Sequence, residues 1–421
     1  MFARAVAVSV VALIALPLRA RAQGLDGGEV APTDAGTPEP AAAPPVPVAP
    51  AALEAPKKPL VEFFAGWGEG VGIKALAGDL SVSLRGRIQL RFTALVPNEN
   101  STSLRTNSFT VRRARLLLKA KYKDELAFTL QLAFAPEEQE SDNTIPLRDV
   151  HLTWTRFRDL NIRVGQMKVP YDRQYLTSSS SLEFLDRGVG VGEFNLERDV
   201  GLMARSDDLF GLGLFGYQLV AMGGEGRNRI GINPGLLFGG RVTVTPLGKF
   251  KDDLVEADLE RHGKPKLALA FSYVRNNATG REKSTHGKLF KNGVVSYDHL
   301  AADLLFKWQG LAVEGAWLWR RGDKAWLEGA DGSFELTRSG WAWYAQASYA
   351  PMKWLSFGAR YGDVFPLASP TGVHRSRELG GYLAGYFLGH DLKVQADYFY
   401  LANEDFTVGN HQVRLQVDAQ F

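Results

Sequence analysis

The sequence predicts an all-β protein, a transmembrane antiparallel up-and-down β-barrel of about 16 strands. Apolar and polar residues alternate with a period of two from about Leu80 to Phe421, which is the strand period. The alternating segments are about ten residues long, as a tilted transmembrane strand requires. Short and long connections alternate between them, which is typical of barrels with short periplasmic turns and long extracellular loops.

Residues 1–22 predict a cleaved signal peptide. Arg4 gives the positive start, residues 5–18 form the apolar core, and Ala20-Arg21-Ala22 is a small-x-small cleavage motif. The apolar core is too short for a membrane-spanning helix, which needs about 20 residues. Together with the barrel pattern, this segment places the mature chain in the outer membrane of a Gram-negative bacterium.

Residues 23–59 predict a disordered linker, because Pro and Ala dominate them and aliphatic or aromatic residues are almost absent. We expect a spacer, with cell-wall binding as the alternative, and place the barrel domain at residues 60–421. The formal net charge is +3, but Arg4, Arg19 and Arg21 lie in the signal peptide, so the mature chain is close to neutral. A nucleic-acid binder with one broad basic face is therefore excluded.

Basic residues gather on the polar faces of the first two predicted strands. If these strands pair, their bases line one sector of the lumen, where the planar Arg guanidinium can donate to two phosphate oxygens at once. The candidate pore-lining residues are Arg85, Arg87, Arg91, Arg113, Arg115 and Lys119. The alternative is a mixed polar lumen in which inward acids pair with the bases. These acids are Asp149, Asp303, Glu314, Glu378, Asp397 and Asp418.

The connection from Lys168 to Arg198 is long for a compact domain, which indicates that it has a function. We expect it to fold into the lumen and to set the size of the opening. Its basic residues are Lys168, Arg173, Arg187 and Arg198, but acids are also present and its net charge is mildly negative. The run Ser178 to Ser181 either donates hydrogen bonds to oxyanions or is solvated loop.

Two further segments carry predictions. The link Pro246–Pro265 stands where a short turn is expected, and we expect a small helix over its acidic part, Asp252 to Glu260. The last segment alternates from Val413 and ends on Phe421. It resembles the closing strand that bacterial outer-membrane proteins present to their barrel-assembly machinery, which is therefore an expected partner.

Several motifs in this order resemble the phosphate-selective porin O/P family. They are Gly86-Arg87-Ile88-Gln89, Val111-Arg112-Arg113-Ala114-Arg115-Leu116, Gly165-Gln166-Met167-Lys168-Val169-Pro170, Leu176-Thr177-Ser178-Ser179, Leu185-Asp186-Arg187, Glu197-Arg198-Asp199-Val200-Gly201 and the terminal Phe421. The likeness extends from about residue 71 to residue 421. It implies a sixteen-stranded, homotrimeric outer-membrane channel whose constriction carries basic residues.

We therefore expect a porin for passive diffusion of small hydrophilic solutes, with outer-membrane lipid and small anions such as phosphate as partners. Anion preference is the broader hypothesis, and selectivity for phosphate or polyphosphate is the narrower one. No cofactor or metal site is expected, since the chain has no Cys and its His residues show no paired ligand spacing. The alternatives are a lipase- or protease-like barrel enzyme using His151 with Asp149, and a structural or adhesive barrel with a plugged lumen.

Overall fold

The computed structural model describes residues 60–140, 143–229, 235–367, 369–404 and 406–421. The predicted signal peptide and linker lie outside these residues. Within the described ranges, no helix is long and apolar enough to cross a membrane.

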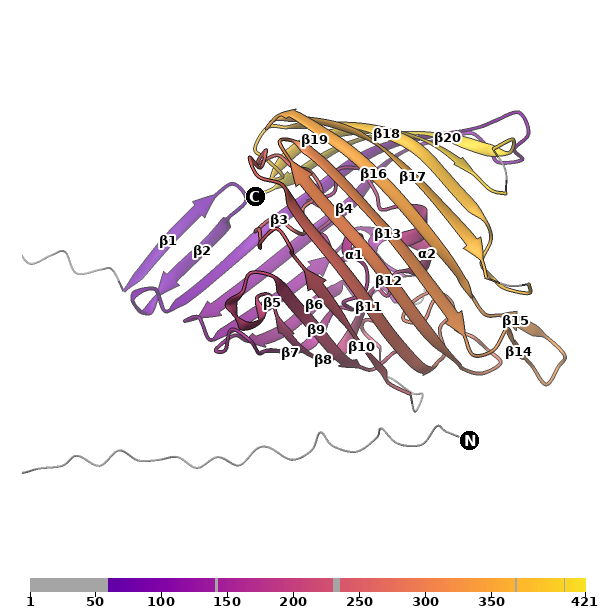
Figure 1. The fold of residues 1–421 in the computed structure, drawn as a ribbon, viewed down its shortest axis with the longest axis horizontal. Helices are drawn as coiled ribbons and strands as arrows, with labels where there is room; N and C mark the ends of the chain where they lie inside the picture. Colours follow the sequence, from indigo (N-terminus) through magenta and orange to yellow (C-terminus); the bar gives the residue numbers. More distant parts are fainter. Residues whose placement is uncertain (1–59, 141–142, 230–234, 368, 405) are drawn as a thin grey trace, which may run out of the picture. The chain divides into compact units, whose positions relative to one another are not determined.

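Sixteen antiparallel strands form a closed barrel (Figure 1). Each of the strands β3–β13 and β16–β20 pairs with its neighbour along the chain, with β13 next to β16. The last strand, β20, pairs with β3 from Gln420↔Arg87 to Asn410↔Pro97 and closes the cylinder. This confirms the predicted up-and-down barrel.

The barrel strands are β3 (Leu80–Pro97), β4 (Thr106–Tyr122), β5 (Leu126–Ala133), β6 (Leu147–Trp154), β7 (Asn161–Lys168), β8 (Arg198–Ser206), β9 (Phe215–Met222), β10 (Leu237–Val244), β11 (Lys266–Thr279), β12 (Val295–Trp308), β13 (Leu311–Gly322), β16 (Gly340–Met352), β17 (Leu355–Pro366), β18 (Ser376–Tyr386), β19 (Leu392–Ala402) and β20 (Gly409–Gln420). The remaining elements are β1 (Val61–Gly66), β2 (Gly70–Ala75), β14 (Trp326–Glu328), β15 (Phe334–Leu336), α1 (Arg173–Leu176), α2 (Val189–Phe194) and the 3-10 turns η1 (Leu76–Gly78), η2 (Pro136–Glu138) and η3 (Leu209–Gly211).

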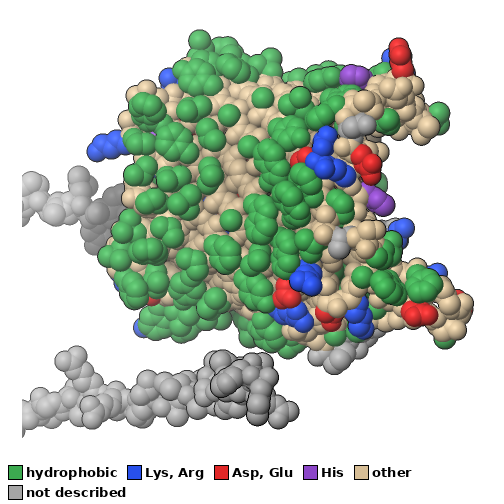
Figure 2. Space-filling model, turned by 45° about the vertical axis from the view of Figure 1, so that its right-hand side comes forward, with side chains coloured by type: hydrophobic (Ala, Val, Ile, Leu, Met, Phe, Trp, Pro, Cys, Tyr) green, Lys and Arg blue, Asp and Glu red, His purple; other side chains and the backbone are tan. Residues whose placement is uncertain are grey.

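Burial along the strands is inverted relative to a water-soluble protein. On β3, Leu90 is 49% exposed, whereas its neighbours Gln89 and Arg91 are 0% and 6% exposed. The polar residues therefore face the interior and the apolar residues face outward, as in a transmembrane barrel with a polar lumen. Figure 2 shows the broad hydrophobic exterior, with charged side chains gathered towards one end of the barrel.

The Lys168–Arg198 connection folds into the lumen, as the sequence suggested. Tyr171 donates its hydroxyl proton to the backbone oxygen of Leu300 on β12, 2.7 Å away. Further along, Arg320 on the wall donates to Glu193, the residue before the end of α2, at 2.6 Å. We call residues 169–197 the lumen loop, because they cross the barrel interior between opposite walls.

The link between β10 and β11 meets the lumen loop. The backbone N–H of Glu256 donates to Ser181 O at 3.2 Å, and the Glu256 carboxylate accepts from the Glu183 N–H at 2.6 Å. Glu256 is 1% exposed. The expected helix over Asp252–Glu260 is wrong, since this stretch forms turns. Its acids bond to the loop and to the wall, and do not support helical hydrogen bonds.

Two hairpins were not predicted. The strands β1 and β2 pair with each other, and β2 also pairs with the start of β3. The short strands β14 and β15 form a second hairpin within the connection from β13 to β16. The glycines at 66, 68, 70 and 72 interrupt the alternation in the first hairpin, which hid it from the period-two analysis.

Gly165 provides a test of the wall beside the lumen loop. Its φ is +127°, and a Cβ there would lie 2.2 Å from the backbone oxygen of Val150 on β6. Gly165→Ala is therefore expected to destabilise the barrel by about 1–3 kcal/mol or more. The measurement is the temperature at which the barrel loses its heat-modifiable gel migration. Gly263→Ala is the control, because nothing lies within 4 Å of its Cβ position, and an equal effect of both changes would contradict the account.

Candidate functional site

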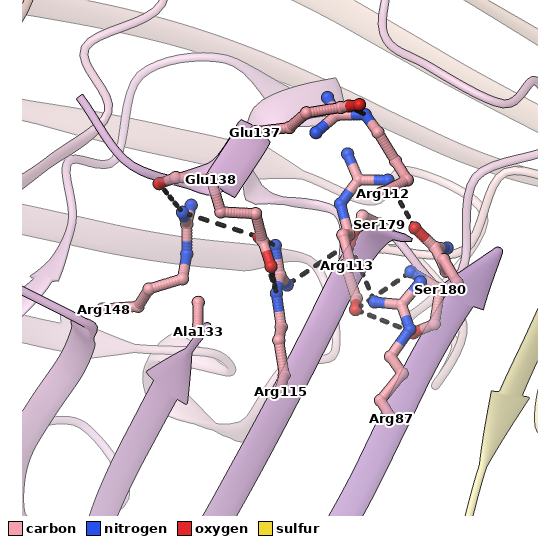
Figure 3. Close-up of polar contacts among 12 residues, drawn as sticks. Arg87, Arg112, Arg113, Arg115, Ala133, Glu137, Glu138, Arg148, Ser179 and Ser180 are labelled. Atoms are coloured by element: carbon pink, nitrogen blue, oxygen red, sulfur yellow. Dashed lines mark hydrogen bonds and ion pairs between the residues drawn. The ribbon is translucent and has the colours of Figure 1, made fainter. Parts of the chain in front are cut away.

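Arginines from β3 and β4 form one wall of the lumen (Figure 3). Arg87 and Arg91 on β3 and Arg113 on β4 are buried, and the register pairs Arg87 with Arg115 and Gln89 with Arg113. The register then shifts between Gln89 and Leu90. This bulge breaks the alternation, so Arg112 also reaches the lumen loop.

Asp186 of the lumen loop is held by four arginines from three strands. Arg91 on β3 pairs with its Oδ2, Arg112 and Arg113 on β4 lie 3.3 Å and 3.4 Å from its Oδ1, and Arg414 on β20 lies 3.0 Å from Oδ2. Burial would raise the pKa of the Asp186 carboxyl, but these guanidinium groups hold it well below its usual range. The carboxylate therefore stays charged and anchors the loop to the basic wall.

Ser179 lies between two arginines of the same wall. Its hydroxyl accepts from Arg87 Nη1 at 2.8 Å and from Arg115 Nη1 at 3.3 Å. Glu138, the last residue of η2, accepts from Arg115 Nε at 2.8 Å, and Arg148 on β6 lies 3.6 Å from the same carboxylate. The serine run therefore meets the basic wall directly, and the hydroxyl of Ser179 accepts a hydrogen bond that a phosphate oxygen could also accept.

A cavity of about 150 Å³ lies beside this contact. Five basic side chains and one carboxylate line it, together with serine hydroxyls. The lining consists of Arg115, Gln131, Arg148, Asp149, Lys168, Tyr175, Leu176, Ser178, Ser179, Arg187 and Arg198. The Nε of Arg148 is buried and has no hydrogen-bond partner among the described residues. We call this space the basic cavity.

Three of the predicted loop bases line the basic cavity. Lys168 donates to the backbone oxygens of Tyr175 and Leu176, at 2.8 and 2.9 Å, and so holds the end of α1. Arg187 stacks 4.8 Å from the Tyr175 ring, and burial lowers its pKa to about 10. Arg198 donates to both oxygens of Asp149, at 2.9 and 3.0 Å.

The other predicted bases lie elsewhere. Arg173 is 1% exposed and pairs with Asp303 on the opposite wall at 2.9 Å. Arg85 donates to the backbone oxygen of Glu69 in the β1–β2 turn, at 3.0 Å. Lys119 is opposite Ser83, close to the end of β4. The structure thus brings Arg87, Arg91, Arg113 and Arg115 together and leaves these three outside the cluster.

Much of the lumen is internally paired, as the mixed-lumen alternative expected. The pairs are Arg87–Asp418, Arg241–Asp303, Arg360–Glu378 and Arg414–Asp397. Asp149 is engaged by Arg198 and not by His151, so this strand offers no oriented acid–histidine pair for a hydrolase.

Acids gather where the lumen loop meets the β10–β11 link. Glu183 accepts from the Ser348 hydroxyl at 2.6 Å and lies beside Glu256. Burial, followed by the nearby Glu256, raises the pKa of Glu183 to about 7. The lumen loop thus joins a basic wall on one side and a buried acidic contact on the other.

Asp252, Asp258 and His262 of this link are close enough to hold a metal ion. Their polar atoms are already used: Lys307 Nζ lies 2.5 Å from Asp252, Gly310 N–H donates to Asp258 at 2.7 Å, and the His262 Nδ1 lies 2.5 Å from Asp258. These contacts fix the link to β12 and to the turn that follows it.

A family model described as phosphate-selective porin O and P matches residues 82–358. The chain belongs to this family. It is therefore an outer-membrane porin, a channel and not an enzyme. No curated protein matches the chain.

Solved structures show the same fold at low sequence identity. The outer-membrane channel DcaP of Acinetobacter baumannii is 14% identical with a TM-score of 0.55, and covers 83% of this porin and 99% of its own chain. An anion-selective porin from Comamonas acidovorans is 14% identical with a TM-score of 0.55, covering 81% and 100%. OmpT of Vibrio cholerae in its trimer form is 12% identical with a TM-score of 0.50, covering 81% and 99%.

The sequence did not reveal three residues of this site. Arg112 was not among the candidate residues, because the bulge that brings it to the lumen loop is not visible in the alternation. Arg148 and Glu138 were also missed. Arg148 is the second residue of the short strand β6, and Glu138 is the last residue of the 3-10 turn η2. The adjacent pair Arg112-Arg113 was the available signal. Strict alternation would turn one of the two arginines towards lipid, where a charged side chain is unfavourable.

Asp186→Asn tests the anchor of the lumen loop. Removing the carboxylate takes away the acidic partner of Arg91 and Arg113, while Arg112 keeps Glu137 and Arg414 keeps Asp397. Because the Asp186 side chain is 26% exposed, the expected loss is smaller than the roughly 3–5 kcal/mol of a fully buried pair. The variant is expected to unfold at lower temperature than the parent, and added inorganic phosphate is expected to restore part of the loss. Equal stability of variant and parent would contradict the anchoring role.

Glu183→Gln tests the acidic contact through its pH dependence. Because burial raises the folded-state pKa of Glu183 from 4.5 to about 7, its contribution to stability is lost as pH rises across this range. The variant is expected to be more stable than the parent at about pH 8 and no more stable at about pH 4. Unfolding temperatures at both pH values measure this, with the exposed Glu260→Gln as control. A pH-independent difference would refute the assignment.

Proposed function

We propose that this porin conducts small hydrophilic anions, and that oxyanions such as phosphate pass through the basic cavity. The proposal rests on the lining of that cavity, which has five basic side chains and the single carboxylate of Asp149. An anion entering it exchanges part of its hydration shell for Arg and Lys donors, while the weakness of each contact lets it leave.

The position of α1 supports passage at this point. Leu176 lines the basic cavity and also a second cavity of about 290 Å³. The second cavity is lined by Arg205 and Ser206 at the end of β8, by Asp207 in the short turn that follows, and by Lys249, Phe250, Lys251, Asp253 and Leu254 of the β10–β11 link. Short turns are periplasmic in outer-membrane barrels, so this cavity is expected on the periplasmic side, and α1 borders both cavities.

Phosphate preference is the narrower proposal. Guanidinium groups can donate two hydrogen bonds to one oxyanion, and Arg115, Arg148, Arg187 and Arg198 converge on the cavity. A halide offers no such geometry. Added inorganic phosphate should therefore reduce the chloride current. A control solution of equal ionic strength that contains neither phosphate nor sulfate should leave the chloride current unchanged.

Arg115→Gln and Arg148→Gln test the proposal directly. Each change removes one positive charge from the cavity, so the zero-current potential in a KCl gradient should shift towards the potassium potential, and phosphate inhibition should weaken. The exposed Lys121→Gln, whose partner is Asp124, is the matched control. An unchanged potential in both cavity variants would remove the cavity from the selectivity mechanism. Absence of any current in the parent would favour the plugged, structural barrel.

We also propose a homotrimer. The family resemblance implies it, and a structure of similar fold is described as a trimer form. Mass measurement of the detergent-extracted porin tests this, and a monomer as the sole species would contradict it. The proposed role of Phe421 in assembly is supported by its place at the closing seam, where its N–H and oxygen exchange hydrogen bonds with Gly86.

A further inference from the structure

The β1–β2 hairpin continues the barrel wall beyond the end of the last strand. β2 pairs with Leu80–Leu84 of β3, on the same edge where β20 pairs from Arg87 onward. The hairpin is drawn beside the C-terminus in Figure 1. Its turn contacts the barrel, since a Cβ at Gly68 would lie 1.9 Å from Asp391 Oδ2 in the β18–β19 turn.

The two faces of the hairpin differ in polarity. The register aligns Phe63 with Ile73 and Ile73 with Val82, and it aligns Val71 with Leu84. The apolar row then continues onto β4. The opposite face aligns Glu62 with Lys74 and Lys74 with Ser81. It also carries Phe64, whose ring centre lies 5.6 Å from Lys74 Nζ.

The apolar face is uncovered within the described chain. Phe63 is 80% exposed and Val71 is 57% exposed. A shallow apolar hollow of about 320 Å³ is lined by Phe63, Val71, Ile73, Val82 and Leu84 of this face, together with Phe64 and Gly72. Contiguous apolar surface of this kind indicates a membrane or protein contact, because exposure to water is unfavourable.

We propose that this face of the hairpin lies in the periplasmic leaflet of the outer membrane, in contact with phospholipid. The face is one surface with the outer side of β3 and β4, whose Leu84 and Leu118 are paired neighbours in a wall that faces lipid. Its turn carries Trp67, and Tyr122 and Trp154 end the nearby strands β4 and β6. Aromatic side chains near strand ends are typical of the membrane interface. A second copy of the chain that covered this face would also have to cover the lipid-facing surface of β3 and β4, which is continuous with it.

Spin labels on single cysteines test the proposal, because the chain has no native Cys. Phe63→Cys and Val71→Cys place the label on the apolar face, and Glu62→Cys and Lys74→Cys place it on the opposite face of the same strands. Full-length variants are labelled and reconstituted in vesicles of phosphatidylethanolamine and phosphatidylglycerol. Collision of the label with oxygen, which partitions into lipid, is compared with collision with a water-soluble nickel complex.

The proposal predicts a higher oxygen-to-nickel collision ratio at positions 63 and 71 than at positions 62 and 74. Equal ratios at all four positions would show that the apolar face is in water and would overturn it. Low collision with both reagents, with dipolar broadening between labels, would show coverage by a second copy and would overturn it equally. Two positions on each face keep the comparison valid if one variant fails to fold.

Discussion

The ion pairs around Asp186 are the interaction on which the interior depends. A carboxylate from the lumen loop meets guanidinium groups from β3, β4 and β20, the strands at the closing seam of the barrel. In this site the attraction is stronger than it would be in water, and its loss would leave Arg91 and Arg113 without a carboxylate partner among the described residues. The same contact therefore holds the loop across the lumen and stabilises the seam.

The position of the loop then determines the path for solutes. With Asp186 anchored on one wall and Glu193 bound to Arg320 on the other, α1 borders both the basic cavity and the second cavity. The β10–β11 link also holds the lumen loop, because the Glu256 carboxylate accepts a hydrogen bond from the Glu183 N–H. Most lumen arginines are paired, and Arg115, Arg148 and Arg198 of the cavity also contact carboxylates. The selectivity that we propose therefore depends on the local excess of basic side chains in the cavity lining and not on the total positive charge of the lumen.

The alternation of apolar and polar residues predicted most of the fold and part of the candidate site. It assigned Arg87, Arg91, Arg113 and Arg115 to the lumen, because a strand puts alternate residues on one face. It missed Arg112, because a bulge adds a residue to that face, and it missed the glycine-rich hairpin before Leu80. Nor did it show that Arg173 reaches Asp303, since the partners of a long loop depend on its three-dimensional path and not on local pattern.

Anions that cross the porin through the basic cavity pass beside the exposed Ser178 in its lining. Single-channel recording of Ser178→Cys during treatment with two thiosulfonate reagents of similar size, one anionic and one cationic, tests this path. If anions pass here, both reagents reduce the current when they react, and the anionic reagent reacts faster. Unchanged current after complete modification, or faster reaction with the cationic reagent, would contradict it.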